Sequence, residues 1–179
     1  MAGSGTFLDR VVLRQVRPRH HQGMLEAGGT MVPCAIGRAG LKRLKREGDG
    51  TTPVGRWPMR YLIWRADRHR RPRTGLEAVA MQPDDAWCEK PTSPDYNRAV
   101  KLPHPDATDS LWREDHLYDF LVVLGHNDDP VVPGAGSAVF FHLAREDYGP
   151  TAGCVAVNLP DMLRILAGCR PGTLLVTES

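Results

Sequence analysis

The sequence contains no long hydrophobic run and no strong excess of one charge. No stretch approaches the roughly 18 consecutive apolar residues of a membrane-spanning helix. The N-terminus also lacks the apolar core of about 7 to 15 residues that a secretory signal contains. Lys and Arg number 23 against 21 for Asp and Glu, a formal net charge of +2, and the basic clusters carry no interleaved aromatic residues. We therefore expect no transmembrane segment and no nucleic-acid partner.

Cysteine is scarce and unpatterned. The chain has four cysteines, without a C-x-x-C pair or zinc-ligand spacing. Cys34, Cys88 and Cys169 are interpreted as small hydrophobic residues, because free cysteine is among the most buried residue types. The sequence therefore predicts no metal site and no cofactor, and it gives no indication of the oligomeric state.

The 179 residues suit a single domain, residues 1–179, that is mainly β. Strands are predicted at residues 8–17, 24–25, 31–36, 60–65, 117–124, 137–143, 154–157 and 173–177, with a hairpin turn at residues 27–30. A short helix is expected at residues 42–52, before a glycine-rich loop. A second helix is expected at residues 161–167, where Asn158 and Pro160 supply residues typical of a helix start.

Residues 66–115 are rich in proline and poor in periodic apolar pattern. Loop-rich insertions of this length are usually functional, so we expect this one to line a substrate groove. Its candidate substrate-binding residues are Trp87, Tyr96, Asn97 and Arg98. Arg98 would bind a carboxylate and Asn97 a peptide backbone. The alternative is that these residues only anchor the loop to the sheet.

A histidine and a Gly-Cys pair stand at the two ends of one short loop. Neighbouring strands would bring the imidazole of His142 within reach of the Cys154 sulfur. A nearby base or imidazolium lowers a thiol pKa from about 8.5 to where the thiolate dominates. Gly153 leaves room for a carbonyl substrate, and the Gly153 and Cys154 amides are candidates for holding an oxyanion. A buried core cysteine is the alternative interpretation of Cys154.

His142 is followed by a Thr-Ala-Gly-Cys box at residues 151–154, and residues 48–57 read Gly-Asp-Gly-Thr-Thr-Pro-Val-Gly-Arg-Trp. Both segments resemble motifs of the L,D-transpeptidase catalytic domain family of the YkuD type. Three features depart from the family's pattern: Ala152 replaces a frequent histidine, Ala156 replaces an Arg or Asn, and the spacing from His142 to Cys154 is short. The resemblance implies a bent, sandwich-like mixed sheet with one or two packed helices.

The resemblance also implies peptidoglycan cross-linking. Cys154 would attack the carbonyl of an L-centre in a stem peptide, and His142 would accept the thiol proton. The D-centre amine of meso-diaminopimelate would then resolve the thioacyl-enzyme. The donor carbonyl belongs to stem residue three in most of the family and to residue one in a subset, so 3,3 and 1,3 cross-links both stay open. Further candidate substrate contacts are Thr151, Tyr148, His126 and Asn127, and His126 can equally be an ordinary surface histidine.

Two other functions share parts of this pattern. An L,D-carboxypeptidase that trims stem peptides during recycling would use every catalytic residue named above. A non-catalytic peptidoglycan-binding module would need no reactive thiol. The resemblance implies the periplasm or cell wall as the location, and because no signal is recognisable, the cytoplasm is the alternative.

Overall fold

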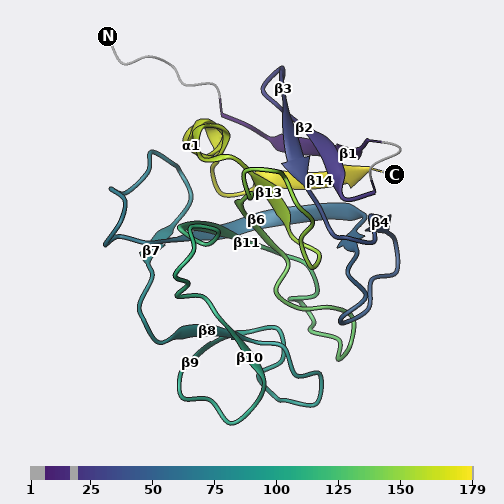
Figure 1. Cartoon of the computed structure of the whole chain (residues 1–179), viewed down its shortest axis with the longest axis vertical. Coiled ribbons are helices and arrows are strands. Elements are labelled where there is room, and N and C mark those ends of the chain that lie inside the picture. The colour runs from purple at the N-terminus through teal and green to yellow at the C-terminus, as the bar shows by residue number, and fades with distance from the viewer. Residues whose placement is uncertain (1–6, 17–19, 179) are drawn as a thin grey trace.

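The computed structural model describes residues 7–16 and 20–178, and these residues form mainly β structure (Figure 1). One large mixed sheet, one three-stranded sheet and one two-stranded sheet are present. The strands are β1 Arg10–Gln15, β2 Gln22–Ala27, β3 Thr30–Ala35, β4 Leu41–Lys42, β5 Thr52–Pro53, β6 Gly55–Trp64, β7 Ala78–Ala80, β8 Asp85–Cys88, β9 Ala99–Lys101, β10 Thr108–Ser110, β11 Phe120–Leu124, β12 Phe140–Leu143, β13 Val155–Val157 and β14 Leu174–Glu178.

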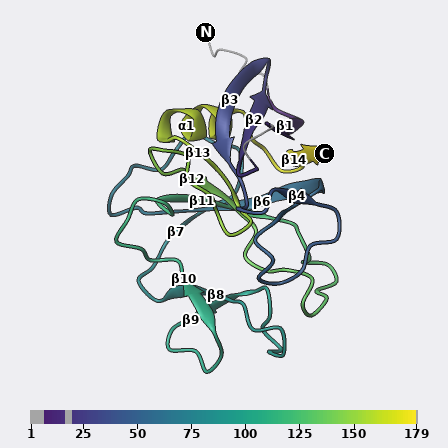
Figure 2. The same cartoon turned by 45° about the vertical axis from the view of Figure 1, so that its right-hand side comes forward.

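The large sheet runs in the order β11-β12-β13-β3-β2-β1-β14-β6-β7. It is mixed, because β1 lies parallel to β14, β12 to β13, and β6 to β7, while the other pairs are antiparallel. The long strand β6 pairs with β14 through its first half and with β11 through its second half, so the sheet curls back on itself. The small β8–β10 sheet lies at the opposite end of the molecule from helix α1 (Figures 1 and 2). The predicted mainly β fold with a mixed sheet is confirmed.

Buried residues form two clusters on opposite faces of β11. Every residue of this strand is buried, and successive side chains point to opposite faces. Phe120, Val122 and Leu124 belong to the main core, whereas Leu121 and Val123 belong to a second cluster. The sheet therefore has a second buried face, on which a site can be built.

Helix α1 (Leu159–Gly168) begins where the sequence predicts. The Asn158 side chain accepts a hydrogen bond from the Asp161 amide at 2.9 Å, and Pro160 lies in the first turn, where its missing N–H leaves no hydrogen bond unmade. Its buried residues are Met162, Ile165 and Leu166. Within the described part of the chain, no helix combines the length and apolar character needed to cross a membrane.

The helix predicted at residues 42–52 is wrong. Strands β4 and β5 pair here in parallel, and turns connect them. Gly48 and Gly50 have φ angles of 71° and 69°, in the left-handed region that a right-handed helix does not contain. The Asp49 carboxylate accepts hydrogen bonds from the Arg46 and Thr51 amides. These local bonds give the backbone an alternative to helical pairing.

Residues 66–115 hold more regular structure than the sequence predicts. Strand β7 extends the large sheet, and β8, β9 and β10 form the separate three-stranded sheet. Each of these strands has only three or four residues, too few for an alternating pattern to be recognised. Trp87 and Leu111 anchor the segment by packing into the second buried cluster.

Candidate active site

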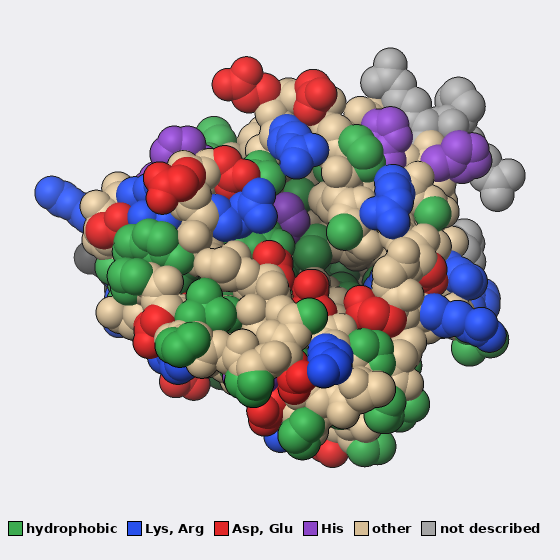
Figure 3. Space-filling model, turned by 60° about the horizontal axis from the view of Figure 1, so that its bottom comes forward, with side chains coloured by type: hydrophobic (Ala, Val, Ile, Leu, Met, Phe, Trp, Pro, Cys, Tyr) green, Lys and Arg blue, Asp and Glu red, His purple; other side chains and the backbone are tan. Residues whose placement is uncertain are grey.

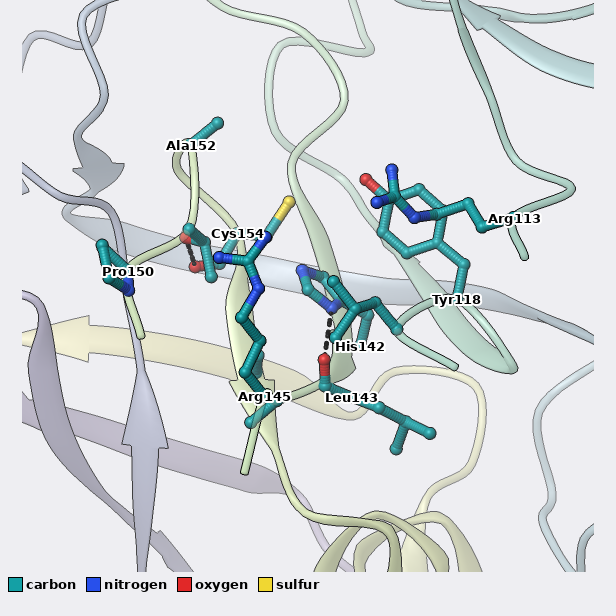
Figure 4. Close-up of a pocket in the computed structure, with 12 residues that line it drawn as sticks. Arg113, Tyr118, His142, Leu143, Arg145, Pro150, Ala152 and Cys154 are labelled. Atoms are coloured by element: carbon teal, nitrogen blue, oxygen red, sulfur yellow. Dashed lines mark hydrogen bonds between the residues drawn. The ribbon is translucent and has the colours of Figure 1, made fainter. Parts of the chain in front are cut away.

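Strands β12 and β13 bring His142 and Cys154 to the same face of the sheet. The strands are parallel, and His142 pairs with Ala156, so Cys154 lies one alternation earlier on the same face. Both side chains line a cavity of about 190 Å³. Figure 4 draws both side chains among the residues that line it. The sequence correctly predicts neighbouring strands, but residue 156, not the cysteine, lies directly opposite His142.

Cys154 is held by the backbone of the segment that leads into β12. Its Sγ atom lies 3.2 Å from the Ala138 carbonyl oxygen and accepts a hydrogen bond from the Phe140 amide at 3.4 Å. Only 7% of the residue is exposed. Burial raises the pKa of the Cys154 thiol to about 12, opposed by the hydrogen bond from the Phe140 amide.

The His142 imidazole is oriented by a backbone carbonyl. Its Nδ1 atom lies 2.8 Å from the Leu143 oxygen, which can only accept, so Nδ1 carries the proton. Nε2 is then the basic nitrogen. The Tyr118 ring packs edge-on against the imidazole with 5.1 Å between ring centroids. Burial lowers the pKa of His142 to about 4, against the smaller raising effect of the Leu143 hydrogen bond.

The lowered pKa of His142 and the raised pKa of Cys154 together mean that both groups are uncharged at neutral pH. At neutral pH the site holds a protonated thiol beside an uncharged imidazole. The prediction that the thiolate dominates is therefore wrong, because both groups are buried and burial penalises both charged forms. A neutral imidazole remains a competent general base, so proton transfer has to accompany attack on a substrate.

The loop before Cys154 is fixed by the Thr151 hydroxyl. It donates to the Cys154 carbonyl at 2.7 Å and accepts from the Gly153 amide at 3.2 Å. The Gly153 amide is therefore engaged within the loop. Among the hydrogen bonds of residues 7–16 and 20–178, none uses the Cys154 amide, which makes it the better candidate donor to an oxyanion.

Gly153 is required by close packing behind the loop. Its φ is 149°, and a Cβ atom there would lie 2.8 Å from the Thr51 carbonyl oxygen and 3.1 Å from Lys45 Nζ. Thr52 Oγ1 donates to the Gly153 carbonyl at 2.8 Å and accepts from the Gly37 amide at 2.9 Å. The upstream motif at residues 48–57 thus supports the back of the Gly-Cys pair.

Lys45 and Asp49 stabilise that support. Lys45 Nζ lies 3.0 Å from the Asp49 carboxylate and donates to the Thr51 carbonyl at 2.7 Å, with its side chain only 4% exposed. The hydrogen bonds from Arg46, Thr51 and Lys45 outweigh the opposing effect of burial and hold the Asp49 pKa well below its usual range. The ion pair and hydrogen bonds of Lys45 and Asp49 therefore fix the position of residues 45–52, which pack against the loop that carries Cys154.

Comparison with known families identifies the family of this chain. The family model described as L,D-transpeptidase catalytic domain, YkuD, matches residues 15–177 of the 179-residue chain. The chain belongs to this family. No curated protein sequence matches it. The matched range includes both motifs on which the resemblance was recognised, so the L,D-transpeptidase assignment is confirmed at the level of the family.

Several predicted substrate contacts of this transpeptidase domain form a buried network instead. The Trp87 indole donates to Asn97 Oδ1 at 3.0 Å, and Asn97 Nδ2 donates to the carbonyls of His126 and Asn127 at 3.0 and 2.7 Å. The Tyr96 hydroxyl accepts from the Gly136 amide at 3.0 Å. These bonds fasten residues 87–97 to the loop after β11, which matches the loop-anchoring alternative.

The remaining predicted contacts are dispersed. His126 packs against Trp57 and bonds the Ala135 carbonyl, and Asn127 closes its own loop through Val132 and Gly136. Arg98 is exposed and does not line a catalytic cavity. Tyr148 lines an adjoining cavity of about 450 Å³, and Thr151 lines the catalytic one.

The structure also identifies residues that the sequence did not indicate. The catalytic cavity contains two guanidinium groups, from Arg113 and Arg145. A second cavity of about 250 Å³ shares Cys154 and is walled by Glu89 and Asp109 of the 66–115 segment. A single charged residue in a loop does not reveal from the sequence which other residues it will lie beside, because only the tertiary fold brings them together. In the described part of the chain, no cluster of three or more His, Cys, Asp or Glu residues could hold a metal ion.

Proposed function

We propose that this protein is a cysteine L,D-transpeptidase that cross-links peptidoglycan stem peptides through a thioacyl-enzyme. The observation that supports this most strongly is that Cys154 and His142 line one cavity, with Nδ1 of His142 hydrogen-bonded to the Leu143 carbonyl, so that Nε2 is the nitrogen that can accept a proton. The family's substrate is peptidoglycan, which supplies the reaction class.

Acylation follows from the neutral resting pair. As the Cys154 sulfur attacks an L-centre carbonyl of the donor stem, its proton passes to Nε2 of His142. The Cys154 amide binds the oxyanion that forms. The imidazolium then protonates the departing amine, and the C–N bond breaks. The His142 hydrogen bond to the Leu143 carbonyl stabilises the transient positive charge.

Deacylation decides which activity results. An amine at the D-centre of meso-diaminopimelate attacks the thioester and forms a cross-link, whereas water releases a trimmed stem. The donor carbonyl is that of stem residue three or of stem residue one. The site is buried, with Cys154 7% and His142 6% exposed, and exclusion of water favours transfer over hydrolysis.

Arg145 is the candidate partner for a donor carboxylate. Its guanidinium reaches into the catalytic cavity (Figure 4) and makes no hydrogen bond or ion pair with another described residue, whereas Arg113 is engaged with Asp115 at 2.6 and 2.9 Å. The cavity lining has no acidic side chain. A guanidinium binds a carboxylate with fixed geometry, so an anionic stem peptide fits this side of Cys154.

The test is incubation of the purified protein with defined muropeptides, followed by mass spectrometry of both. A thioacyl adduct on the intact protein and dimeric muropeptides support the proposal, and fragmentation of the dimer identifies the 3,3 or 1,3 linkage. Trimmed monomers alone would identify a carboxypeptidase instead. If the protein is unmodified and the muropeptides are unchanged, the non-catalytic peptidoglycan-binding module is the remaining hypothesis.

A further inference from the structure

The Cys154 side chain belongs to the walls of two cavities. The first, with His142, is the catalytic cavity of about 190 Å³, and the second, with a volume of about 250 Å³, has a largely different lining that includes Glu89 and Asp109. Cys154, Tyr118 and Ala152 line both. Two reactants can therefore reach the same residue through two cavities.

The two cavities differ in charge. The catalytic cavity contains two guanidinium groups and no carboxylate. The second cavity contains three carboxylates and two positive groups, of which Lys45 is paired with Asp49 and Arg38 donates to the Gly48 carbonyl. Figure 3 shows the hollowed face, with acidic side chains below a histidine and basic side chains around the upper rim. An anionic reactant fits one side and a cationic reactant the other.

One of the three carboxylates has no hydrogen-bonding partner among the described residues. Glu47 accepts from the Tyr96 and Ser137 hydroxyls, and Asp109 accepts from the Tyr118 hydroxyl at 3.0 Å. Glu89 accepts no such bond, while its own amide, bonded to the Ala107 carbonyl at 3.0 Å, fixes its position just after β8. It is the carboxylate on this wall that is left to bind a ligand.

On the basis of the function proposed above, we propose that the second cavity is the acceptor site and that Glu89 binds the acceptor ammonium and takes its first proton. The acceptor amine is protonated at neutral pH and cannot attack until it loses that proton. Glu89 faces the same cavity as the Cys154 sulfur, so the free amine forms beside the thioester.

The protonation state of Glu89 suits this role. Burial first, then the charges of Asp109 and Glu47, raise its pKa to about 7. A base with a pKa near the working pH can take a proton and also release it. The other charged or titratable groups that line this cavity are Arg38, Lys45, Glu47, Asp109, Tyr118 and Cys154.

The transfer balances in protons and bonds. The ammonium gives one proton to the Glu89 carboxylate, and the amine attacks the thioester carbonyl, forming the C–N bond. A second N–H proton passes to His142. Collapse of the tetrahedral intermediate breaks the C–S bond as His142 returns this proton to the sulfur. The products are an amide, a neutral Cys154 thiol and a protonated Glu89, which releases its proton to solvent.

The test measures how the thioacyl-enzyme partitions between an added amine and water. Glu89→Gln is compared with wild type and with Glu77→Gln, an exposed glutamate before β7 that lines neither cavity. The acceptors are glycinamide, which is largely protonated at neutral pH, and hydroxylamine, which is uncharged there. Thermal melting verifies the fold, and Glu89→Asp tests whether a carboxylate alone restores part of the transfer.

Glu89→Gln should lower the ratio of transfer to hydrolysis for glycinamide by at least about tenfold and leave acylation and transfer to hydroxylamine within about twofold. Unchanged partitioning, or an equal fall for both amines, would overturn the role of Glu89 while the transpeptidase mechanism stands. If the wild-type protein forms no thioacyl adduct before any amine is added, the proposed function itself fails, and the acceptor assignment fails with it.

Discussion

The two faces of the β12–β13 pair are both buried but differ in what burial achieves. The face toward the main core consists of Phe141, Leu143, Val155 and Val157. The face toward the catalytic cavity consists of Phe140, His142, Cys154 and Ala156. On the first face burial removes apolar surface from water and stabilises the fold. On the second it keeps a thiol and an imidazole neutral, which costs stability in one pH range and prepares a reaction.

The largest expected effect lies on the catalytic face. Cys154→Ser should leave a folded protein with no measurable turnover, because a hydroxyl beside imidazole is a far weaker nucleophile than a thiol. Muropeptide conversion and intact-protein mass spectrometry measure the loss, and circular dichroism verifies the fold. Conversion at the wild-type rate by the serine variant would remove Cys154 from the mechanism.

A substitution on the core face should have the opposite profile. Phe141→Ala removes a fully buried ring and should lower the free energy of unfolding by about 3 to 5 kcal/mol. Urea denaturation measures this loss. The acylation rate of the remaining folded protein should stay close to wild type. A normal unfolding free energy combined with lost acylation would show that the two faces are not separable.

The neutral imidazole also predicts how stability depends on pH. The pKa of His142 falls from 6.5 to about 4 on folding, so its unfolded form binds a proton first as the pH decreases. Stability is unaffected above pH 6.5 and is lost between pH 6.5 and about pH 4, by on the order of 3 kcal/mol. In His142→Gln this part of the pH dependence should vanish, as urea denaturation across that range can measure. An unaltered profile in the variant would indicate a charged or solvated ring.

A smaller effect is expected at the mouth of the catalytic cavity. Arg145→Gln should lower kcat/KM for muropeptides by roughly ten- to a hundredfold, the loss of a charge-assisted hydrogen bond worth about 1.5 to 3 kcal/mol. Arg98→Gln is the matched control, since Arg98 is also exposed but lines neither cavity. Melting temperatures should stay unchanged in both. Equal kcat/KM values for the two variants would show that Arg145 does not bind the substrate carboxylate. A larger loss of kcat/KM in Arg98→Gln would instead support Arg98 as the carboxylate-binding residue, as the sequence predicts.

The sequence predicts elements whose signal is local. Strand β11 is recognised by its continuous apolar run, helix α1 by Asn158 and Pro160, and the cysteine site by its spacing from His142. The helix predicted at residues 42–52 fails because the turn bonds of Asp49 are as local as a helix and compete with it.

The features that the sequence cannot predict are those that depend on which side chains the tertiary fold brings together. Trp87 and Asn97 have residue types that suit peptide binding, yet their hydrogen bonds are made inward. Glu89 and Arg145 are ordinary loop charges in the sequence and reach the cysteine only through the tertiary fold. The protonation of the thiol is likewise set by burial, which residue spacing alone does not report.

The hydrogen bond from Thr52 to the Gly153 carbonyl joins residues that lie 101 positions apart in the chain. Such a contact requires closing a long loop, whose entropic cost is met only when most other contacts have formed. We therefore expect the geometry around the nucleophile to be completed only once the long-range contacts of the fold have formed. Catalytic competence should then report the finished fold more strictly than secondary-structure content does, and partly folded chains should not acylate.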